Sequence, residues 1–322
     1  MSADSPFRCF VCGVDARAAN VEVHSDNGYD LVRCAACRTL FTDARNAPPS
    51  SELYPAFSQS ADGVAAASNK AAGGFLRKRV SVAQSVSPTG RSLDFGAGNG
   101  AFARAMQAAG FDSVGLEPFS LGTPTTSPGL TLLRAPLTDA APSLGHFDVI
   151  TMWHVFEHLD NPVEALRQLA GHLTPTGAFV ISVPNEGSWQ RRVFRRSWFH
   201  LDPPRHLIHF DAKTLAEVLG RADLQVTANH PFLPEYGTSG WVQSVLNRML
   251  PHRNFLYEVV KDRGALAKMP RASFIGHLAV SLAIGAPIFV LAWPVERMAA
   301  RKNAAAALTV VARPRPVEAR NG

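Results

Sequence analysis

The glycine-rich stretch at residues 91–117 constrains the fold of this chain more than any other; it is RSLDFGAGNGAFARAMQAAGFDSVGLE. A short apolar run, typical of the end of a buried strand, leads into Gly96, Gly98 and Gly100, and helix-forming residues and a second apolar run follow. Glycines at a strand-to-helix turn let the backbone approach a ligand, and the start of the helix offers unpaired N–H groups. Glu117 ends the second run, about 20 residues on, where an acidic residue can bind ribose hydroxyls. The stretch therefore predicts a nucleoside-binding strand–helix–strand unit.

Two further features make this prediction more specific. Asp94 immediately precedes the glycines, and a second strand-like block follows at the distance expected for another parallel strand. Together LDFGAGNG, GLEP and FDVITMWHVFEH resemble the class I S-adenosylmethionine-dependent methyltransferases, over roughly residues 75–230 with a return in the last twenty. The resemblance is to the small-molecule branch, which includes ubiquinone-pathway enzymes, and it implies S-adenosyl-L-methionine as the cofactor. By position in these motifs, it implies cofactor contacts at Asp94, Gly96, Ala97, Gly98, Gly100, Glu117, Leu137 and Trp153.

Strand and helix signals alternate along most of the chain, which predicts an α/β fold. The expected architecture is a doubly wound, mostly parallel, seven-stranded Rossmann-like methyltransferase sheet that binds ligands at the carboxyl ends of its strands. The expected strands are 93–95, 113–116, 130–133, 149–153, 178–183, 224–228 and 307–312. The expected parts are a zinc-ribbon module at 1–45, a linker at 46–74, the methyltransferase domain at 75–235, an apolar helical insertion at 236–303, and a final strand and tail at 304–322.

All four cysteines of the chain lie in its first 37 residues, as Cys9-x-x-Cys12 and Cys34-x-x-Cys37. Two such pairs are typical of zinc ribbons, in which four thiolates bind the metal tetrahedrally. A redox pair or disulfides are the alternatives, and a cytosolic setting disfavours disulfides. Because four protein ligands leave no open coordination position, the expected Zn²⁺ is structural rather than catalytic.

The ends and the charge of the chain give weaker indications. The N-terminus has no charged start followed by an apolar core and a cleavage site, so no signal peptide is expected and we expect a cytoplasmic location. The net charge of +6 and the isoelectric point near 9.4 are compatible with anionic substrates, nucleic acid or an anionic membrane surface, and favour none of them.

The segment after the expected strand 149–153 is His154-Val155-Phe156-Glu157-His158. Its literal H-x-x-E-H pattern occurs in one class of zinc peptidases, but here it lies at a strand-to-helix turn rather than within a helix. The segment more closely resembles the E-x-x-E-H of ubiquinone-pathway O-methyltransferases, where the acids and the histidine can hold a divalent metal. His154 replaces the first glutamate, and magnesium prefers oxygen ligands. Three roles therefore stay open for this segment: packing around the cofactor, general-base catalysis by a histidine, and metal binding.

The region 185–210 follows the expected strand 178–183, where related enzymes build a substrate lid. Its PRHLIHF segment resembles the P-x-H-x-x-x-F signature of small-molecule methyltransferases, so the expected catalytic set is His158 together with His154 or His206. Four arginines spaced i, i+1, i+4 and i+5 would share one helical face, which is either a solvated face or a clamp for an anionic group. These arginines are Arg191, Arg192, Arg195 and Arg196.

Residues 274–293 are twenty residues whose only ionisable side chain is His277, and they pass the length and hydropathy test for a membrane span. A single span would place the final strand, 307–312, across the bilayer from its sheet. We therefore expect this segment to be interfacial, re-entrant or buried. Basic residues flank it on both sides, as expected for contact with one anionic leaflet. They are Lys268, Arg271, Arg297, Arg301 and Lys302.

These features predict an S-adenosylmethionine-dependent methyltransferase that O- or C-methylates a small or lipid-linked acceptor, anionic ones included. It is expected in the cytoplasm, in peripheral contact with the inner face of the membrane. A zinc-ribbon ribosomal-RNA base methyltransferase is one alternative; it suits the basic charge but not the apolar insertion, and nucleic acid is not the expected partner. A non-catalytic membrane adaptor is another, which the intact glycine turn and Glu117 disfavour.

Overall fold

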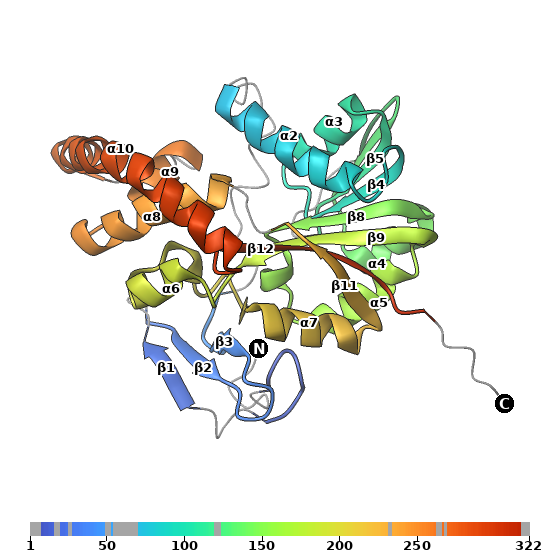
Figure 1. The fold of residues 1–322 in the computed structure, drawn as a ribbon, viewed down its shortest axis with the longest axis horizontal. Helices are drawn as coiled ribbons and strands as arrows, with labels where there is room; N and C mark the ends of the chain where they lie inside the picture. Colours follow the sequence, from blue (N-terminus) through green and yellow to red (C-terminus); the bar gives the residue numbers. More distant parts are fainter. Residues whose placement is uncertain are drawn as a thin grey trace.

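The computed structural model describes residues 8–15, 20–24, 28–48, 53, 70–118, 124–230, 234–261, 266 and 269–316. Most of the expected linker, including Tyr54 and Phe57, lies outside the described residues, as do Lys268 and the last six residues. The described chain forms one large sheet with helices on both faces, a small N-terminal sheet and a group of helices at the side of the large sheet (Figure 1).

The large sheet is mostly parallel and contains every strand expected from the sequence. Five strands, β4, β5, β7, β8 and β9, are parallel to one another, whereas β12 is antiparallel to both β9 and β11 and β6 is antiparallel to β7. An eighth strand, β6, is a short exposed edge strand that has no apolar signal in the sequence. The order across the sheet is β11 (Leu224–Asn229), β12 (Ala307–Pro314), β9 (Leu173–Pro184), β8 (Phe147–Trp153), β4 (Gly90–Phe95), β5 (Phe111–Leu116), β7 (Leu130–Leu133) and β6 (Thr125–Ser127).

Helices cover both faces of this sheet, so the expected doubly wound arrangement is confirmed (Figure 1). α2 (Lys70–Gln84) and α3 (Ala101–Ala108) bury apolar residues on one face. α4 (Leu137–Leu144), α5 (Pro162–Ala170) and α7 (Ala212–Arg221) bury theirs on the other. Strand β8 serves both cores, because Val149 and Trp153 pack on the first face while Ile150 and Met152 pack on the second.

Two local expectations differ from the structure. The strand expected at 178–183 begins earlier, at Leu173, because Gly177 continues the strand. A methyl group at Gly177 would lie only 2.8 Å from the Phe147 carbonyl oxygen, so a glycine suits this position. The expected shared face of four arginines does not form. Helix α6 (Trp189–Phe194) ends before Arg195, which has a φ of +49° and starts the 3₁₀ turn η4 (Arg195–Ser197).

The cysteine-bearing N-terminal region forms a small antiparallel sheet of β1 (Asn20–His24), β2 (Asp30–Arg33) and β3 (Leu40–Thr42). Its fourth strand is β10 (Ile208–His209), which belongs to the catalytic part of the chain. The buried residues of the two sheets form one continuous cluster that joins Cys9, Cys34 and Phe41 to the large sheet. The ribbon-like region therefore shares its core with the rest of the molecule.

The C-terminal insertion is helical and returns to the sheet. It contains α8 (Pro234–Met249), α9 (Phe255–Lys261) and the long α10 (Arg271–Arg301). These three helices lie together at one side of the sheet (Figure 1). Strand β12 begins six residues after α10 and inserts between β9 and β11, so α10 ends beside the large sheet.

Candidate active site

The glycine loop lies between the end of β4 and the start of α3. Gly96, Gly98 and Gly100 have φ values of +82°, +54° and +78°, a region that side-chain-bearing residues rarely adopt. The backbone N–H groups of Gly96 and Ala97 donate to the Leu116 carbonyl, at 2.7 and 3.1 Å, and tie the loop to the end of β5. A methyl group at Gly96 would come within 2.2 Å of Val155, so the segment after β8 packs directly on the loop.

Two buried carboxylates flank this loop. The Gly98 N–H donates to Oε2 of Glu117 over 2.7 Å, and the Thr151 hydroxyl donates to Oδ1 of Asp94 over 2.9 Å. Burial raises the pKa of Asp94 to about 7; the Thr151 hydrogen bond and the nearby Arg79 charge oppose this shift, and the Glu117 charge adds to it. A cation bound here would restore the ionised form of Asp94.

The other two predicted cofactor residues, Trp153 and Leu137, are also buried. Trp153 ends β8, packs edge-on against Phe102 with ring centroids 5.5 Å apart, and has the Arg79 guanidinium 5.2 Å from its ring centre. Its indole Nε1 is buried and has no hydrogen-bond partner among the described residues. Leu137 is the first residue of α4, which follows β7. The predicted residues thus border one edge of the sheet, where the parallel strands end.

This set fits S-adenosylmethionine. The positive-φ glycines leave backbone exposed for close approach, Glu117 offers a carboxylate for hydroxyl groups, and Asp94 offers a second carboxylate for a cation. The orphan Trp153 indole N–H is an additional donor at the same edge.

The three predicted catalytic histidines come together around Glu157. After β8 the chain turns through His154, with a φ of +56°, into the 3₁₀ turn η3 (Phe156–His158). Nδ1 of His154 lies 3.3 Å from Oε1 of Glu157, and Nε2 of His206 lies 3.9 Å from the same oxygen. The rings of His158 and His206 are 4.8 Å apart.

Backbone carbonyls fix the orientation of two of these rings. Nδ1 of His158 lies 2.8 Å from the Arg205 carbonyl, and Nδ1 of His206 lies 2.8 Å from the His200 carbonyl. A carbonyl oxygen only accepts, so each Nδ1 carries a hydrogen. Burial, reinforced by the charges of His158 and His209, lowers the pKa of His206 well below its ordinary value. Nε2 of His206 therefore holds a free electron pair at neutral pH and can accept a proton.

Glu157 lies at the centre of this group; it belongs to the segment for which packing, general-base catalysis and metal binding all stayed open. Its side chain is fully buried, and neither carboxylate oxygen has a hydrogen-bond partner among the described residues. Donor atoms of Glu157, His158 and His206 lie within 4.8 Å of one another and can hold a metal ion. Two imidazoles and one carboxylate suit zinc, iron or manganese better than magnesium. His206, not His154, completes this donor set.

Two residues that the sequence analysis missed close the site. The ring of Tyr236, from α8, stacks on His154 with centroids 3.6 Å apart. Arg79, from α2, hydrogen-bonds the Tyr236 hydroxyl and lies over both the Trp153 and Tyr236 rings. The C-terminal helical insertion thus supplies Tyr236 to the group of side chains around Glu157. No sequence pattern marks Tyr236, because it is separated from His154 by about 80 residues of chain.

The arginines of region 185–210 lie elsewhere. Arg191 is buried and faces Glu186, with Nε 4.0 Å from Oε1, whereas Arg192, Arg195 and Arg196 are exposed. Arg205 pairs with Asp202 at 2.7 Å. The expected clamp on one helical face is therefore absent from the described part of the chain.

The four cysteines form a compact cluster. Their sulfur atoms lie within 4.8 Å of one another, with Cys9–Cys37 and Cys12–Cys34 separations of 3.6 Å, and all four are free thiols. A tetrahedral zinc with bonds of about 2.3 Å sets sulfur–sulfur distances of about 3.8 Å. Burial raises the pKa of Cys9 and of Cys12. Burial also acts on Cys34, but backbone hydrogen bonds from Cys37 and Ala36 outweigh it and lower its pKa. The donor set and its dimensions fit a zinc ion.

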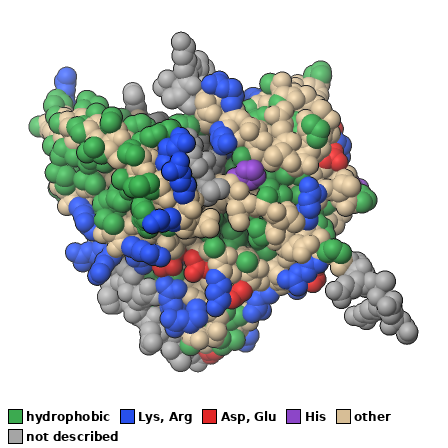
Figure 2. Space-filling view, in the orientation of Figure 1, with side chains coloured by type: hydrophobic (Ala, Val, Ile, Leu, Met, Phe, Trp, Pro, Cys, Tyr) green, Lys and Arg blue, Asp and Glu red, His purple; other side chains and the backbone are tan. Residues whose placement is uncertain are grey.

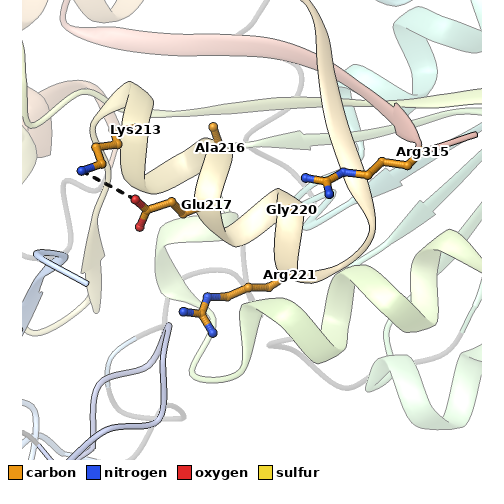
Figure 3. Close-up of a pocket in the computed structure, with 6 residues that line it drawn as sticks. All are labelled: Lys213, Ala216, Glu217, Gly220, Arg221 and Arg315. Atoms are coloured by element: carbon orange, nitrogen blue, oxygen red, sulfur yellow. Dashed lines mark ion pairs between the residues drawn. The ribbon is translucent and has the colours of Figure 1, made fainter. Parts of the chain in front are cut away.

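A surface hollow lies apart from both sites, on α7 and the residue after β12 (Figure 3). Lys213 and Glu217 on its rim form an ion pair at 3.9 Å. None of the predicted site residues lines it. The lining residues are Lys213, Ala216, Glu217, Gly220, Arg221 and Arg315.

Comparison with known proteins agrees with this geometry. A family model described as a methyltransferase domain matches residues 64–229, just over half of the chain. The chain belongs to this methyltransferase family. With its glycine loop and buried acids, the methyltransferase is a class I, S-adenosylmethionine-dependent enzyme. No curated protein matches the sequence of this methyltransferase.

Solved structures resemble the methyltransferase at low sequence identity. Coclaurine N-methyltransferase bound to N-methylheliamine and SAH is 14% identical, with 74% of this chain and 70% of that chain covered and a TM-score of 0.45. An S-adenosylmethionine-dependent methyltransferase from Mesorhizobium loti is 17% identical, with 69% and 90% covered and a TM-score of 0.38. The Burkholderia thailandensis 1,6-didemethyltoxoflavin-N1-methyltransferase is 15% identical, with 66% and 91% covered and a TM-score of 0.39.

Proposed function

We propose that this methyltransferase O- or C-methylates a small or lipid-linked acceptor, held between the glycine loop and the group formed by Glu157, His158 and His206. The convergence of these three side chains, from two distant segments, carries the proposal. The group lies next to the cofactor edge, because Val155 packs on Gly96. The four-cysteine cluster would bind one structural Zn²⁺, and the free thiols suit a reducing, cytoplasmic setting.

Each residue has a distinct part in this mechanism. S-adenosylmethionine supplies an electrophilic methyl group on a positively charged sulfur. Asp94 and Glu117 are the buried carboxyl groups that would hold the cofactor through charge and hydrogen bonds, and the buried Trp153 would border it. Nε2 of His206 accepts the proton of the acceptor, and the adjacent Glu157 carboxylate stabilises the imidazolium that results. His154 and Tyr236 cover the site and limit the access of water.

The same donors suggest a metal-assisted variant of this function. Hydrogen bonds from Nδ1 to backbone carbonyls are typical of the outer contacts of metal-binding histidines, and His158 and His206 both make them. Nε2 of His206 lies 3.9 Å from Oε1 of Glu157. A bound divalent ion would hold an acceptor hydroxyl and lower its pKa. Metal analysis distinguishes the two variants: more than one metal per chain indicates a second site besides the cysteines.

The proposal is tested by methyl transfer from radiolabelled S-adenosylmethionine to fractionated cell extracts, combined with mass spectrometry of ligands that copurify with the protein. We expect label in a small-molecule or lipid fraction, and its loss in His206→Gln. His172→Gln is the matched control, because His172 also donates Nδ1 to a carbonyl at 2.8 Å but lies at the amino end of β9. Methyl label in RNA instead, together with RNA binding that weakens steeply as the salt concentration rises, would contradict the proposal.

A further inference from the structure

Helix α10 has its large apolar side chains on the outside. The side chains of Leu282, Val290 and Leu291 are 62%, 70% and 69% exposed, and other large apolar residues along the helix are exposed as well. These other residues are Ile275, Phe289, Trp293 and Met298. Among the described residues, α10 is the one helix long and apolar enough to cross a membrane, with 11% of its most apolar window buried.

The buried side of α10 has the opposite composition. It presents mostly small residues, and a methyl group at Gly285 would lie 3.2 Å from Val242 of α8. A helix of a soluble protein normally buries its large apolar residues and exposes polar ones. In α10 small residues mediate helix–helix contact and large apolar residues face outward, which is the pattern of helices in contact with lipid. The buried residues of α10 are Ser281, Gly285, Ala292, Glu296, Ala299 and Ala300.

Basic side chains lie at both ends of this apolar face. Arg271 is exposed at its start, and Arg297, Arg301 and Lys302 are exposed at its end. Figure 2 shows hydrophobic side chains gathered over the α8–α10 region, with lysine and arginine side chains along its border. The single acidic residue of α10, Glu296, is buried. The Arg297 guanidinium lies over the Trp293 ring at 5.9 Å, an arrangement of aromatic and basic groups that suits a headgroup layer.

Contacts along α10 hold it flat against the body of the protein. At its start, Phe274 packs on Phe255 of α9 with ring centroids 5.5 Å apart. At its end, Glu296 accepts hydrogen bonds from the Trp241 indole and from the backbone N–H of Ala306. Beneath it, α8 carries buried polar residues such as Gln243 and Asn247, which would be costly inside a bilayer. Both ends of α10 therefore lie on the same side of any membrane.

We propose that the outer face of α10, from Ile275 to Met298, docks the methyltransferase on the surface of an anionic lipid bilayer. This stretch is about 35 Å long at the helical rise of about 1.5 Å per residue. Because both ends of α10 pack on the body of the protein, α10 lies in the plane of the interface. A second copy of the chain is a poorer occupant. Either relative orientation of two α10 helices would bring basic ends together, whereas anionic headgroups are complementary to these ends.

The test is sedimentation of the full-length protein with vesicles of phosphatidylcholine and phosphatidylglycerol, or of phosphatidylcholine alone. We expect binding to the anionic vesicles that weakens as salt is raised. Combining Leu282→Glu with Leu291→Glu should reduce binding by about tenfold or more, because the two exposed side chains lie on the two flanks of the outer face and the pair places a charge on each flank. Replacing Arg271 and Arg301 by serine should reduce binding to anionic vesicles. Val226→Glu is the matched control, since Val226 is an exposed apolar residue of β11 rather than of α10, and it should change nothing.

Three results would overturn this docking proposal. The first is a parent protein that stays in the supernatant with both kinds of vesicle. The second is a Leu282→Glu, Leu291→Glu variant that binds like the parent while retaining the parent's circular dichroism spectrum. The third is light scattering that shows a parent dimer dissociated by these substitutions, without vesicle binding, which would make the face a contact between copies. Binding to vesicles does not require methyl transfer, so this test is independent of the proposed acceptor.

Discussion

Glu117 is held close to the glycine loop by the hydrogen bond that its Oε2 accepts from the Gly98 N–H. We predict that Glu117→Ala weakens S-adenosylmethionine binding by about 1.5–3 kcal/mol, because a charged partner of the ribose is lost. Isothermal titration calorimetry measures this directly. Glu217→Ala, at an exposed position on α7, is the control. Unchanged affinity would remove Glu117 from the cofactor site.

Gly98 has a φ of +54°, which a β-branched residue adopts only with strain. We predict that Gly98→Val abolishes cofactor binding while the sheet still folds, because the side chain strains the loop and blocks close approach to its backbone. Cofactor titration and circular dichroism test the two parts separately. Gly276→Ala is the control, because Gly276 lies in α10 with open space around it. Normal affinity in Gly98→Val would contradict the predicted contact.

Asp94 gives the cofactor site a pH dependence. Its pKa of about 7 means that the cofactor-free protein holds this carboxyl protonated below that pH, and a cationic cofactor must displace the proton. We predict that the affinity for S-adenosylmethionine increases by up to about tenfold for each unit that the pH is raised toward 7, and that it is constant above pH 7. In the cofactor-free protein the same shift makes stability fall as the pH rises from about 4 to 7, because the unfolded chain releases this proton earlier. Calorimetry in buffers of different ionisation enthalpy should show proton release, and Asp94→Asn should abolish it.

At the scale of elements, the N-terminal ribbon packs directly on the methyltransferase domain, because β3 pairs with β10. The sequence predicts a ribbon at 1–45 as a module apart from the methyltransferase domain, and in the structure the two share one buried core. We now predict one zinc per chain in the parent, bound by the four cysteines, and for Cys34→Ser loss of zinc together with a lower free energy of unfolding of the whole chain. Metal analysis and denaturant titration test this. Zinc-free parent protein purified without chelator would contradict it.

Thr42 is the direct link between the two elements. Its hydroxyl donates to the His206 carbonyl over 2.6 Å and lies 3.1 Å from Nε2 of His209, and it is fully buried. We predict that Thr42→Val lowers the free energy of unfolding by about 1–3 kcal/mol, because buried partners lose their hydrogen bonds. The rate of methyl transfer should also fall, because Thr42 positions the segment that carries His206. The affinity for S-adenosylmethionine should not change, because Thr42 contacts this segment and not the glycine loop. Thr42→Ser should restore both properties, and equal losses in Thr42→Ser and Thr42→Val would contradict this role.

At the scale of the whole molecule, Glu296 joins the insertion to the sheet. Its side chain is buried in α10 and accepts hydrogen bonds from Gln190 of α6, Trp241 of α8 and the backbone N–H of Ala306 before β12. We predict that Glu296→Ala lowers the free energy of unfolding by more than about 3 kcal/mol, because it leaves these buried donors unpaired. Denaturant titration measures the loss. Glu258→Ala, at a partly exposed ion pair with His252, should cost far less. Equal losses would refute a joining role for Glu296.

Local patterns in the amino-acid sequence specify the central sheet and the edge where the cofactor residues lie. Alternating apolar runs and helical segments specify strands buried on both faces, and the positive φ values at Gly96, Gly98 and Gly100 require residues without a side chain. At the start of α7, Asp211 and Thr214 form a reciprocal capping box. These features depend on neighbours within a few residues, which a single sequence displays directly.

The residues that surround that edge are brought there by long-range packing. Glu157 lies at the centre of the histidine group because the turn after β8 meets the segment before β10, which carries His206. These two segments are about 50 residues apart in the chain, and no local sequence pattern encodes their contact. Tyr236 reaches His154 only because α8 packs beside the sheet. The exposed face of α10 likewise depends on which side of the helix meets α8, since an apolar helix of this composition could have buried either side. Such contacts join residues far apart in the chain, and packing rather than local propensity selects them.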